Sequence, residues 1–151
     1  MAEQLIVSNS LTINAPVSSV WDALTNPEQT MKYMFGCRVI SDLKVGSPML
    51  WKGMVEGQEM LFVKGNVLHV EPEVQLVYTV FDPNSDVADI PENYLTVTYS
   101  LAAADGQTVL TITQGDYAAV ANGEQRYIES VGAGGWMSLM TAIKTLLEPT
   151  V

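Results

Sequence analysis

Residues 124–148 read EQRYIESVGAGGWMSLMTAIKTLLE and contain no proline. Apolar residues recur every three or four positions in the second half, so this stretch predicts one long helix that Pro149 ends. Gly132, Gly134 and Gly135 lie in its middle, where each costs about 1 kcal/mol relative to alanine. We expect these glycines either to bend the helix or to let another segment approach its backbone closely.

The chain before this helix is dominated by patterns typical of β-strands, with apolar residues at alternate positions. The predicted strands are residues 5–13, 38–42, 48–55, 58–70, 74–81, 94–103 and 107–115. Asp105-Gly106 is a strong hairpin signal between the last two. Two short helices are expected after the first strand, over residues 16–24 and 28–34, and residues 82–93 are expected to form a loop. Because the strands form one run with helices outside it, the pattern predicts an α+β fold.

Length, composition and charge exclude several classes of protein. The chain has 151 residues, which predicts a single domain over residues 1–151. Its hydrophobic content of 48% excludes a disordered chain. The net charge of −10 disfavours nucleic acids and anionic membrane surfaces as partners. One cysteine cannot form an internal disulfide, and one histidine cannot build a multi-histidine zinc site.

The sequence gives no targeting signal. The N-terminus reads MAEQLIV and lacks the basic and apolar regions of a signal peptide. No apolar stretch approaches the ~20 residues that a membrane-spanning helix requires. We therefore expect a cytoplasmic protein, in agreement with the free thiol of Cys37.

Several local motifs resemble those of the activator of heat-shock-protein-90 ATPase homologue family, within the START-like (SRPBCC) superfamily. The motifs are INAP at residues 13–16, VWDALT at 20–25, DLKVGS at 42–47, VEP at 70–72, LVYT at 76–79 and GW at 135–136, followed by Leu139, Lys144, Leu147 and Glu148. Ser47 stands where that family usually has a second glycine. The resemblance covers essentially the whole chain and implies a helix-grip fold, in which a curved antiparallel sheet wraps around the long C-terminal helix.

Methionine and aromatic residues are abundant on the elements that face each other in such a fold. Methionine adapts to irregular shapes, so these residues either line a ligand cavity between sheet and helix or simply fill the core. The apolar candidates are Tyr33, Met34, Phe35, Trp51, Met54, Met60, Phe62, Tyr127, Trp136, Met137 and Met140. The polar candidates for orienting a ligand are Tyr78, Tyr94, Thr98, Tyr117 and Arg126. Arg126 would bind a ligand carboxylate or pair with Glu124 or Glu129.

No residue is assigned a catalytic role. His69 would need an orienting acid and an accessible pocket; the alternative is a partly buried strand histidine beside Glu71. Cys37 has Arg38 as its neighbour, but adjacent strand residues point to opposite faces. Residues 82–86 lack the glycine and glutamate of a calcium loop, so neither a metal nor a cofactor is expected.

Three functions therefore remain open. The first is a non-catalytic protein that binds a small hydrophobic or amphipathic molecule, with the short helices and residues 82–93 at the entrance. The second is a cyclase, dehydratase or hydrolase acting on a polyketide-like compound, which the superfamily resemblance permits. The third is a co-chaperone-like interaction module, although 151 residues leave no room for the additional domain of the eponymous activators. A homodimer also stays open.

Overall fold

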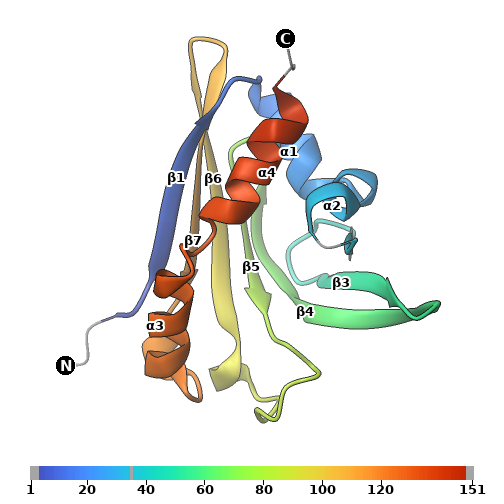
Figure 1. Cartoon of the computed structure of the whole chain (residues 1–151), viewed down its shortest axis with the longest axis vertical. Coiled ribbons are helices and arrows are strands. Elements are labelled where there is room, and N and C mark those ends of the chain that lie inside the picture. The colour runs from blue at the N-terminus through green and yellow to red at the C-terminus, as the bar shows by residue number, and fades with distance from the viewer. Residues whose placement is uncertain (1–3, 35, 149–151) are drawn as a thin grey trace.

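The computed structural model describes residues 4–34 and 36–148. Seven strands form one antiparallel sheet in the order β1-β7-β6-β5-β4-β3-β2. Figure 1 shows that the sheet is curved, with β3 and β4 turning away from the direction of β1, β6 and β7. The strands are β1 (Val7–Ile13), β2 (Arg38–Ser41), β3 (Pro48–Val55), β4 (Gln58–Glu71), β5 (Gln75–Val80), β6 (Leu95–Ala104) and β7 (Gln107–Gly115).

The α-helices lie outside the run of strands β2 to β7. They are α1 (Val17–Thr25), α2 (Pro27–Tyr33), α3 (Gly123–Gly132) and α4 (Met137–Leu147), with short 3-10 helices η1 (Pro91–Asn93) and η2 (Tyr117–Ala119). Helix α4 packs against β1, α1 and α2 (Figure 1). The predicted α+β fold, with two short helices after the first strand and a C-terminal helix on a curved antiparallel sheet, is confirmed. No helix in the described ranges is long and apolar enough to cross a membrane.

The predicted break between the two short helices follows from local capping. Asn26 stands before α2, and its side chain accepts a hydrogen bond of 3.0 Å from the backbone N–H of Glu28. Pro27 occupies the first helical position, where its missing N–H costs nothing. At α1 the prediction is off by one residue, because Pro16 has an extended backbone and precedes the helix as its cap.

The prediction of one long terminal helix over residues 124–148 is wrong, because the glycines break it into α3 and α4. Gly134 and Gly135 have φ of +92° and +60°, a left-handed backbone that disfavours other residues. The turn is fastened to β1: the Trp136 backbone N–H donates to Asn9 Oδ1 at 2.9 Å, and Asn9 Nδ2 donates to the Gly134 carbonyl at 3.3 Å. Both expected roles of the glycines, a change of direction and a close approach, are thus present.

The main core lies between the sheet and the helices α1 and α4. Its fully buried side chains include Leu24 of α1, Tyr99 of β6 and Ile143 of α4. A smaller cluster centres on Tyr117, and Trp136 packs against both clusters. The turn between α3 and α4 therefore joins the two parts of the apolar interior.

Two β-bulges change the predicted alternation in β4. Trp51 pairs with Val63 and Lys52 pairs with Leu61, so Phe62 is the extra residue of the first bulge. A second bulge at Leu68 lets Val70 pack against the core and leaves His69 exposed. The expected strand histidine beside Glu71 is therefore exposed and not partly buried. Its ring nitrogen Nε2 lies 3.3 Å from a carboxylate oxygen of Glu71, the neighbour that the sequence suggested.

We predict that Gly135→Ala lowers the free energy of unfolding by about 2 kcal/mol or more. A Cβ at this position would lie 2.4 Å from Asn9 Oδ1 and 2.8 Å from Val7 Cγ1. The matched control is Gly132→Ala, whose Cβ would meet nothing within 4 Å, and which should be neutral or stabilising by about 0.5 kcal/mol. Urea unfolding of both variants checks this, and equal stabilities would contradict the role assigned to the turn.

Candidate functional site: an apolar cavity

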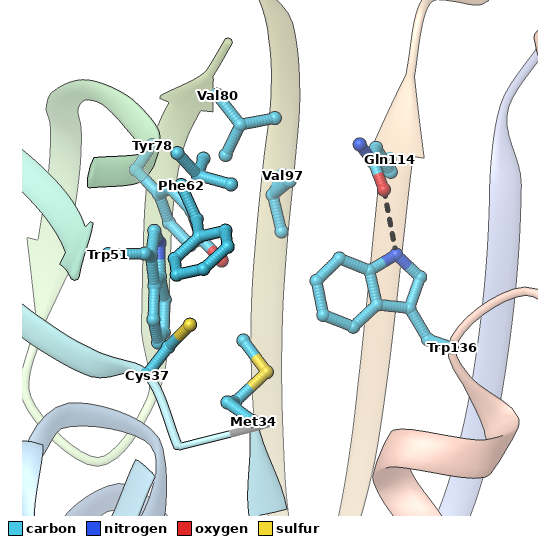
Figure 2. A pocket seen from close by; sticks show the side chains of 10 residues that line it. Met34, Cys37, Trp51, Phe62, Tyr78, Val80, Val97, Gln114 and Trp136 are labelled. Atoms are coloured by element: carbon cyan, nitrogen blue, oxygen red, sulfur yellow. Dashed lines mark hydrogen bonds between the residues drawn. The ribbon is translucent and has the colours of Figure 1, made fainter. Parts of the chain in front are cut away.

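A cavity of about 410 Å³ lies on the inner side of the curved sheet (Figure 2). Its wall is built mainly from aliphatic, aromatic and sulfur-containing side chains, with Gln114 as the one carboxamide. The lining residues are Met34, Cys37, Trp51, Phe62, Val63, Tyr78, Val80, Val97, Gln114 and Trp136.

Strand periodicity positions most of this wall. Tyr78 and Val80 lie two residues apart on β5, so both side chains point to the same face. Val97 on β6 pairs with both Tyr78 and Gln114 in the sheet register, which places three lining residues side by side. The bulge at Phe62 adds a further side chain, because Phe62 and its neighbour Val63 both reach the cavity.

Two segments outside the sheet complete the cavity. Met34 and Cys37 follow α2 and lie opposite Trp136, as Figure 2 shows. Trp136 comes from the turn between α3 and α4, whereas Met140, one turn further along α4, is fully buried in the core. The cavity therefore lies between the sheet and the turn that precedes α4, and not beneath the middle of a continuous helix.

Contacts of the indole ring and of the backbone fix the orientation of Trp136. Its indole Nε1–H donates to Gln114 Oε1 at 3.0 Å. The ring also packs edge-on against Tyr99, with centroids 6.2 Å apart and an interplanar angle of 82°, an arrangement that aromatic pairs favour. Because the backbone N–H is bonded to Asn9, the ring has a fixed orientation at the cavity wall.

Buried tyrosine hydroxyls bond to one another or to backbone. Tyr78 donates to the Tyr99 hydroxyl oxygen at 2.5 Å, and Tyr33 donates to the Ala23 carbonyl at 2.5 Å. Burial raises the pKa of all three phenols above its ordinary value. These hydroxyls are therefore protonated at neutral pH and place no charge near the cavity.

The Cys37 thiol faces the cavity from the opposite side to Trp136 (Figure 2). Burial raises the pKa of this thiol, because an apolar surrounding disfavours the thiolate. A protonated thiol is a poor nucleophile, so the position of Cys37 favours packing against a ligand over attack on one.

The structure brings together only some of the residues that the sequence proposed for the site. Met34, Trp51, Phe62, Tyr78 and Trp136 line the cavity. Phe35 lies outside the described residues. The remaining apolar candidates are elsewhere: Tyr33 and Met140 pack in the core, Met60 and Met137 are half-buried, and Met54 is exposed at the far end of β3.

The polar candidates other than Tyr78 do not line the cavity either. Thr98 is on the outer face of β6, between the inward-facing Val97 and Tyr99. Arg126 lies 5.9 Å from the ring centroid of Tyr117 and donates to the Ala121 carbonyl at 3.4 Å. Neither proposed role of Arg126 matches these contacts.

Tyr117, Tyr127 and Tyr94 belong to other parts of the molecule. Tyr117 belongs to η2 and Tyr127 to α3, and their rings pack edge-on with the centroids 6.0 Å apart. Tyr94 directly precedes β6 and is not part of the cavity wall. Its ring stacks on Phe81, with ring centroids 4.9 Å apart.

Sequence reasoning missed five lining residues. Val63, Val80 and Val97 are ordinary apolar strand positions that periodicity alone does not single out, and the sequence gives no sign that Cys37 borders a cavity. The sequence does contain a signal for Gln114. This polar residue follows Leu110 and Ile112 at alternate positions of β7, so its side chain points to the same inner face.

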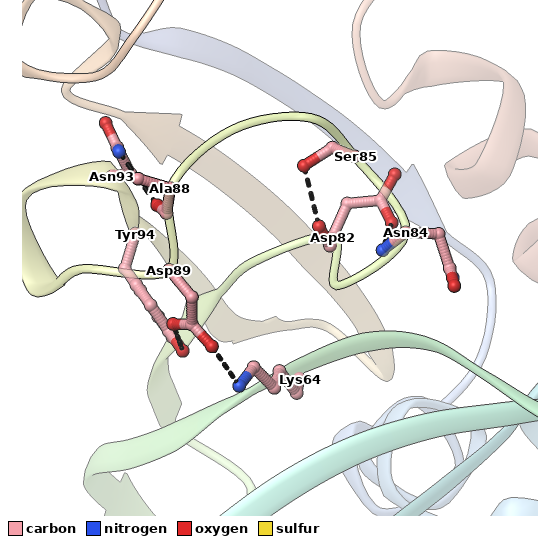
Figure 3. A network of polar contacts seen from close by, with 8 residues as sticks. All are labelled: Lys64, Asp82, Asn84, Ser85, Ala88, Asp89, Asn93 and Tyr94. Atoms are coloured by element: carbon pink, nitrogen blue, oxygen red, sulfur yellow. Dashed lines mark hydrogen bonds and ion pairs between the residues drawn. The ribbon is translucent and has the colours of Figure 1, made fainter.

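The loop of residues 82–93 is fastened to β4 instead of covering the cavity (Figure 3). Lys64 pairs with Asp89, which also accepts a hydrogen bond of 2.6 Å from the Tyr94 hydroxyl. These partners lower the pKa of Asp89, the Lys64 hydrogen bond having the largest effect. Asn84 Nδ2 donates to the Leu61 carbonyl at 2.9 Å. None of residues 82–93, all of which are described, contributes a side chain to the cavity wall.

The described residues contain no group of three or more histidine, cysteine, aspartate or glutamate side chains placed to hold a metal ion. The cavity itself is suited to binding an uncharged molecule, because its wall combines apolar surface with one carboxamide.

Comparisons with known proteins agree with this architecture. The family described as activator of Hsp90 ATPase homolog 1-like protein matches residues 14–148. The solution structure of a Cytophaga hutchinsonii protein is 33% identical with a TM-score of 0.74, covering 97% of this chain and 96% of that one. None of the curated proteins compared with the chain matches it.

More distant solved structures share the fold. CalU16 from Micromonospora echinospora is 20% identical with a TM-score of 0.67, and the match covers 96% of this chain and 76% of that one. An HSP90 activator from Plasmodium falciparum is 17% identical with a TM-score of 0.59, covering 74% and 72%. At these identities the likeness concerns the fold alone.

We predict that Cys37 of the folded protein reacts with iodoacetamide at least ten times more slowly at pH 8 than Cys37 of the urea-unfolded chain. The raised pKa leaves less thiolate at a given pH, so the pH midpoint of the reaction should lie above the ordinary thiol value of about 8.5. Mass spectrometry of the alkylated protein gives both rates. Equal rates and equal midpoints in the two states would contradict the burial assigned to this thiol.

Proposed function

This chain belongs to the activator of Hsp90 ATPase homologue 1-like family of START-like domains, and on that premise we propose that it binds a small hydrophobic or amphipathic molecule. The observation that carries the proposal is the apolar cavity of about 410 Å³ behind Trp136. Ligand sites in proteins are commonly apolar cavities of about this size with a few placed polar groups.

Burial of apolar surface would supply most of the binding free energy. A ligand that loses about 250 Å² of apolar surface gains about 6 kcal/mol before the cost of association is subtracted. Met34, Cys37 and Phe62 provide soft or aromatic surface on one side of the cavity, and Trp136 provides an immobilised ring on the other. A pre-formed wall of this kind reduces the entropy lost on binding.

The enzyme and co-chaperone alternatives have weaker support. Burial raises the pKa of Cys37, and His69 lies on the outer surface beside Glu71, so neither acts readily on a molecule in the cavity. The P. falciparum protein is an HSP90 activator, but its likeness to this chain concerns the fold alone. We therefore keep small-molecule binding as the proposed function.

Native mass spectrometry of protein purified without detergent tests this function directly. The expected result is an additional mass of a few hundred daltons that disappears on denaturation. Protein that stays free of bound mass after incubation with a panel of neutral apolar compounds at millimolar concentration would contradict the proposal and favour a protein partner.

A pair of variants on β5 links the bound mass to the cavity. Val80→Phe places a ring in the cavity and should lower ligand occupancy at least tenfold, because the added volume displaces the ligand. The control is Val77→Phe on the outer face of the same strand, which should leave occupancy unchanged. Equal occupancy in both variants would place the ligand elsewhere.

A further inference from the structure

We propose that Gln114 makes this cavity selective for neutral molecules that carry a hydrogen-bond acceptor of the carbonyl type. The inference rests on the proposed binding function and specifies the class of ligand. Its basis is the orientation of one side-chain amide, together with the distribution of charge around the cavity.

The Trp136 indole fixes the orientation of the Gln114 amide. An indole nitrogen can only donate a hydrogen bond, so the Gln114 atom 3.0 Å from Trp136 Nε1 must be the oxygen. The amide nitrogen Nε2 is thereby directed away from Trp136, as Figure 2 shows. The usual ambiguity between the two ends of a glutamine amide is removed by this contact.

Gln114 Nε2 is available to a ligand. Among the described residues the only side-chain hydrogen bond of Gln114 is the one that its oxygen accepts. Every described side-chain nitrogen or oxygen that is fully buried has a hydrogen-bond partner, so Nε2 is not fully buried and borders open space. Because Gln114 lines the cavity, we take Nε2 as the donor that a bound molecule can reach.

The other polar groups of the wall also favour an acceptor on the ligand. The Trp51 indole is a donor only. The Tyr78 hydroxyl is already bonded to Tyr99, and the Cys37 thiol is protonated. A ligand whose polar group is an acceptor therefore finds partners, whereas a ligand that must donate finds few.

The charge distribution disfavours an anionic ligand. None of the described lining residues is Lys, Arg, His, Asp or Glu. The cations next to lining residues in the sequence are already paired, Arg38 and Lys52 with Glu59 and Lys64 with Asp89. A carboxylate in the cavity would lose its hydration without gaining a counter-charge, and the net charge of −10 would repel it further.

The same amide penalises a plain hydrocarbon. A hydrocarbon that fills the cavity displaces water from Gln114 Nε2 and leaves a buried donor without a partner. Sites that hydrogen-bond a ligand group discriminate against analogues lacking it for this reason. Gln114 therefore favours the binding of a ketone, aldehyde, ester or amide and disfavours the binding of an isosteric alkene.

Three naphthalene probes of similar shape test the inference by isothermal titration calorimetry at pH 8: 2-acetylnaphthalene, 2-isopropenylnaphthalene and 2-naphthoate. The ketone and the alkene differ in one acceptor atom, and the naphthoate carries a charge. Wild-type protein should bind the naphthoate at least ten times more weakly than the ketone. Gln114→Met, which keeps the side-chain length, should reduce the preference for ketone over alkene about tenfold. The matched control is Gln107→Met, at the exposed start of the same strand, which should leave all three affinities unchanged.

The outcomes separate this inference from the proposed function. If wild-type protein binds both neutral probes and Gln114→Met leaves their ratio unchanged, the inference is overturned while cavity binding stands. If wild-type protein binds neither neutral probe at 1 mM, the proposed function fails and the inference fails with it. Tighter binding of naphthoate than of the ketone would also overturn the inference.

A second readout distinguishes contact with the ligand from a purely structural role for Gln114. In the wild-type protein, one side-chain N–H proton of Gln114 should shift downfield in a ¹H–¹⁵N spectrum when the ketone binds, and not when the alkene binds. Equal shifts with both probes would show that Gln114 only positions Trp136 and would overturn the inference. Circular dichroism and thermal unfolding of Gln114→Met establish that the variant is folded.

Discussion

The hydrogen bond from the Trp136 backbone to Asn9 is the contact on which the arrangement of the C-terminal half depends. It requires the left-handed backbone at Gly134 and Gly135, and a Cβ at Gly135 would collide with Asn9. This turn ends α3, starts α4 in a new direction and places the indole of Trp136 over the inner face of the sheet.

The cavity follows from this turn and from the curvature of the sheet. Helix α4 fills the space beside α1, where Met140 and Ile143 are fully buried. Before α4 begins, the Trp136 ring faces the sheet across the cavity from the side opposite Met34 and Cys37, and the bulge at Phe62 turns two consecutive side chains inward. Interiors are normally close-packed, so an apolar space of about 410 Å³ lacks the dispersion contacts that a core of this size would make. A ligand of the proposed kind would restore those contacts.

Charged and titratable groups lie on the outer surface of the protein, whereas the groups that face the cavity are uncharged. Lys64, Asp89 and His69 lie in exposed contacts on the outer surface. Inside, burial raises the pKa of Tyr78 and of Cys37 further above neutral pH, so both groups are uncharged, and Gln114 is neutral by its chemistry. The interior therefore suits recognition by shape and by hydrogen bonding.

The sequence predicted the strands and the two short helices because alternation, helical periodicity and turn residues are local signals. Asn26 and Pro27 even marked the boundary between α1 and α2. The break at Gly134 depended on Asn9, more than 120 residues away, and a local pattern cannot reveal such a partner. The bulges at Phe62 and Leu68 also depended on pairing with other strands.

The candidate site was predicted less completely than the fold. Residues were selected by type, so aromatic and methionine residues on the right elements, such as Trp51 and Trp136, were included. The same criterion admitted Met54, which is exposed, and omitted Val97 and Gln114. Which apolar side chains border empty space depends on the packing of neighbours, and periodicity shows only which face they occupy.

Xenon binding tests the central claim, an open apolar cavity behind Trp136, most directly because it needs no knowledge of the natural ligand. Xenon enters dry apolar cavities in proteins. A crystal pressurised with xenon should show an anomalous peak in van der Waals contact with Trp51, Val97 and Trp136. A crystal in which xenon is absent from this space, with side chains of Phe62 or Trp136 filling it instead, would contradict the account.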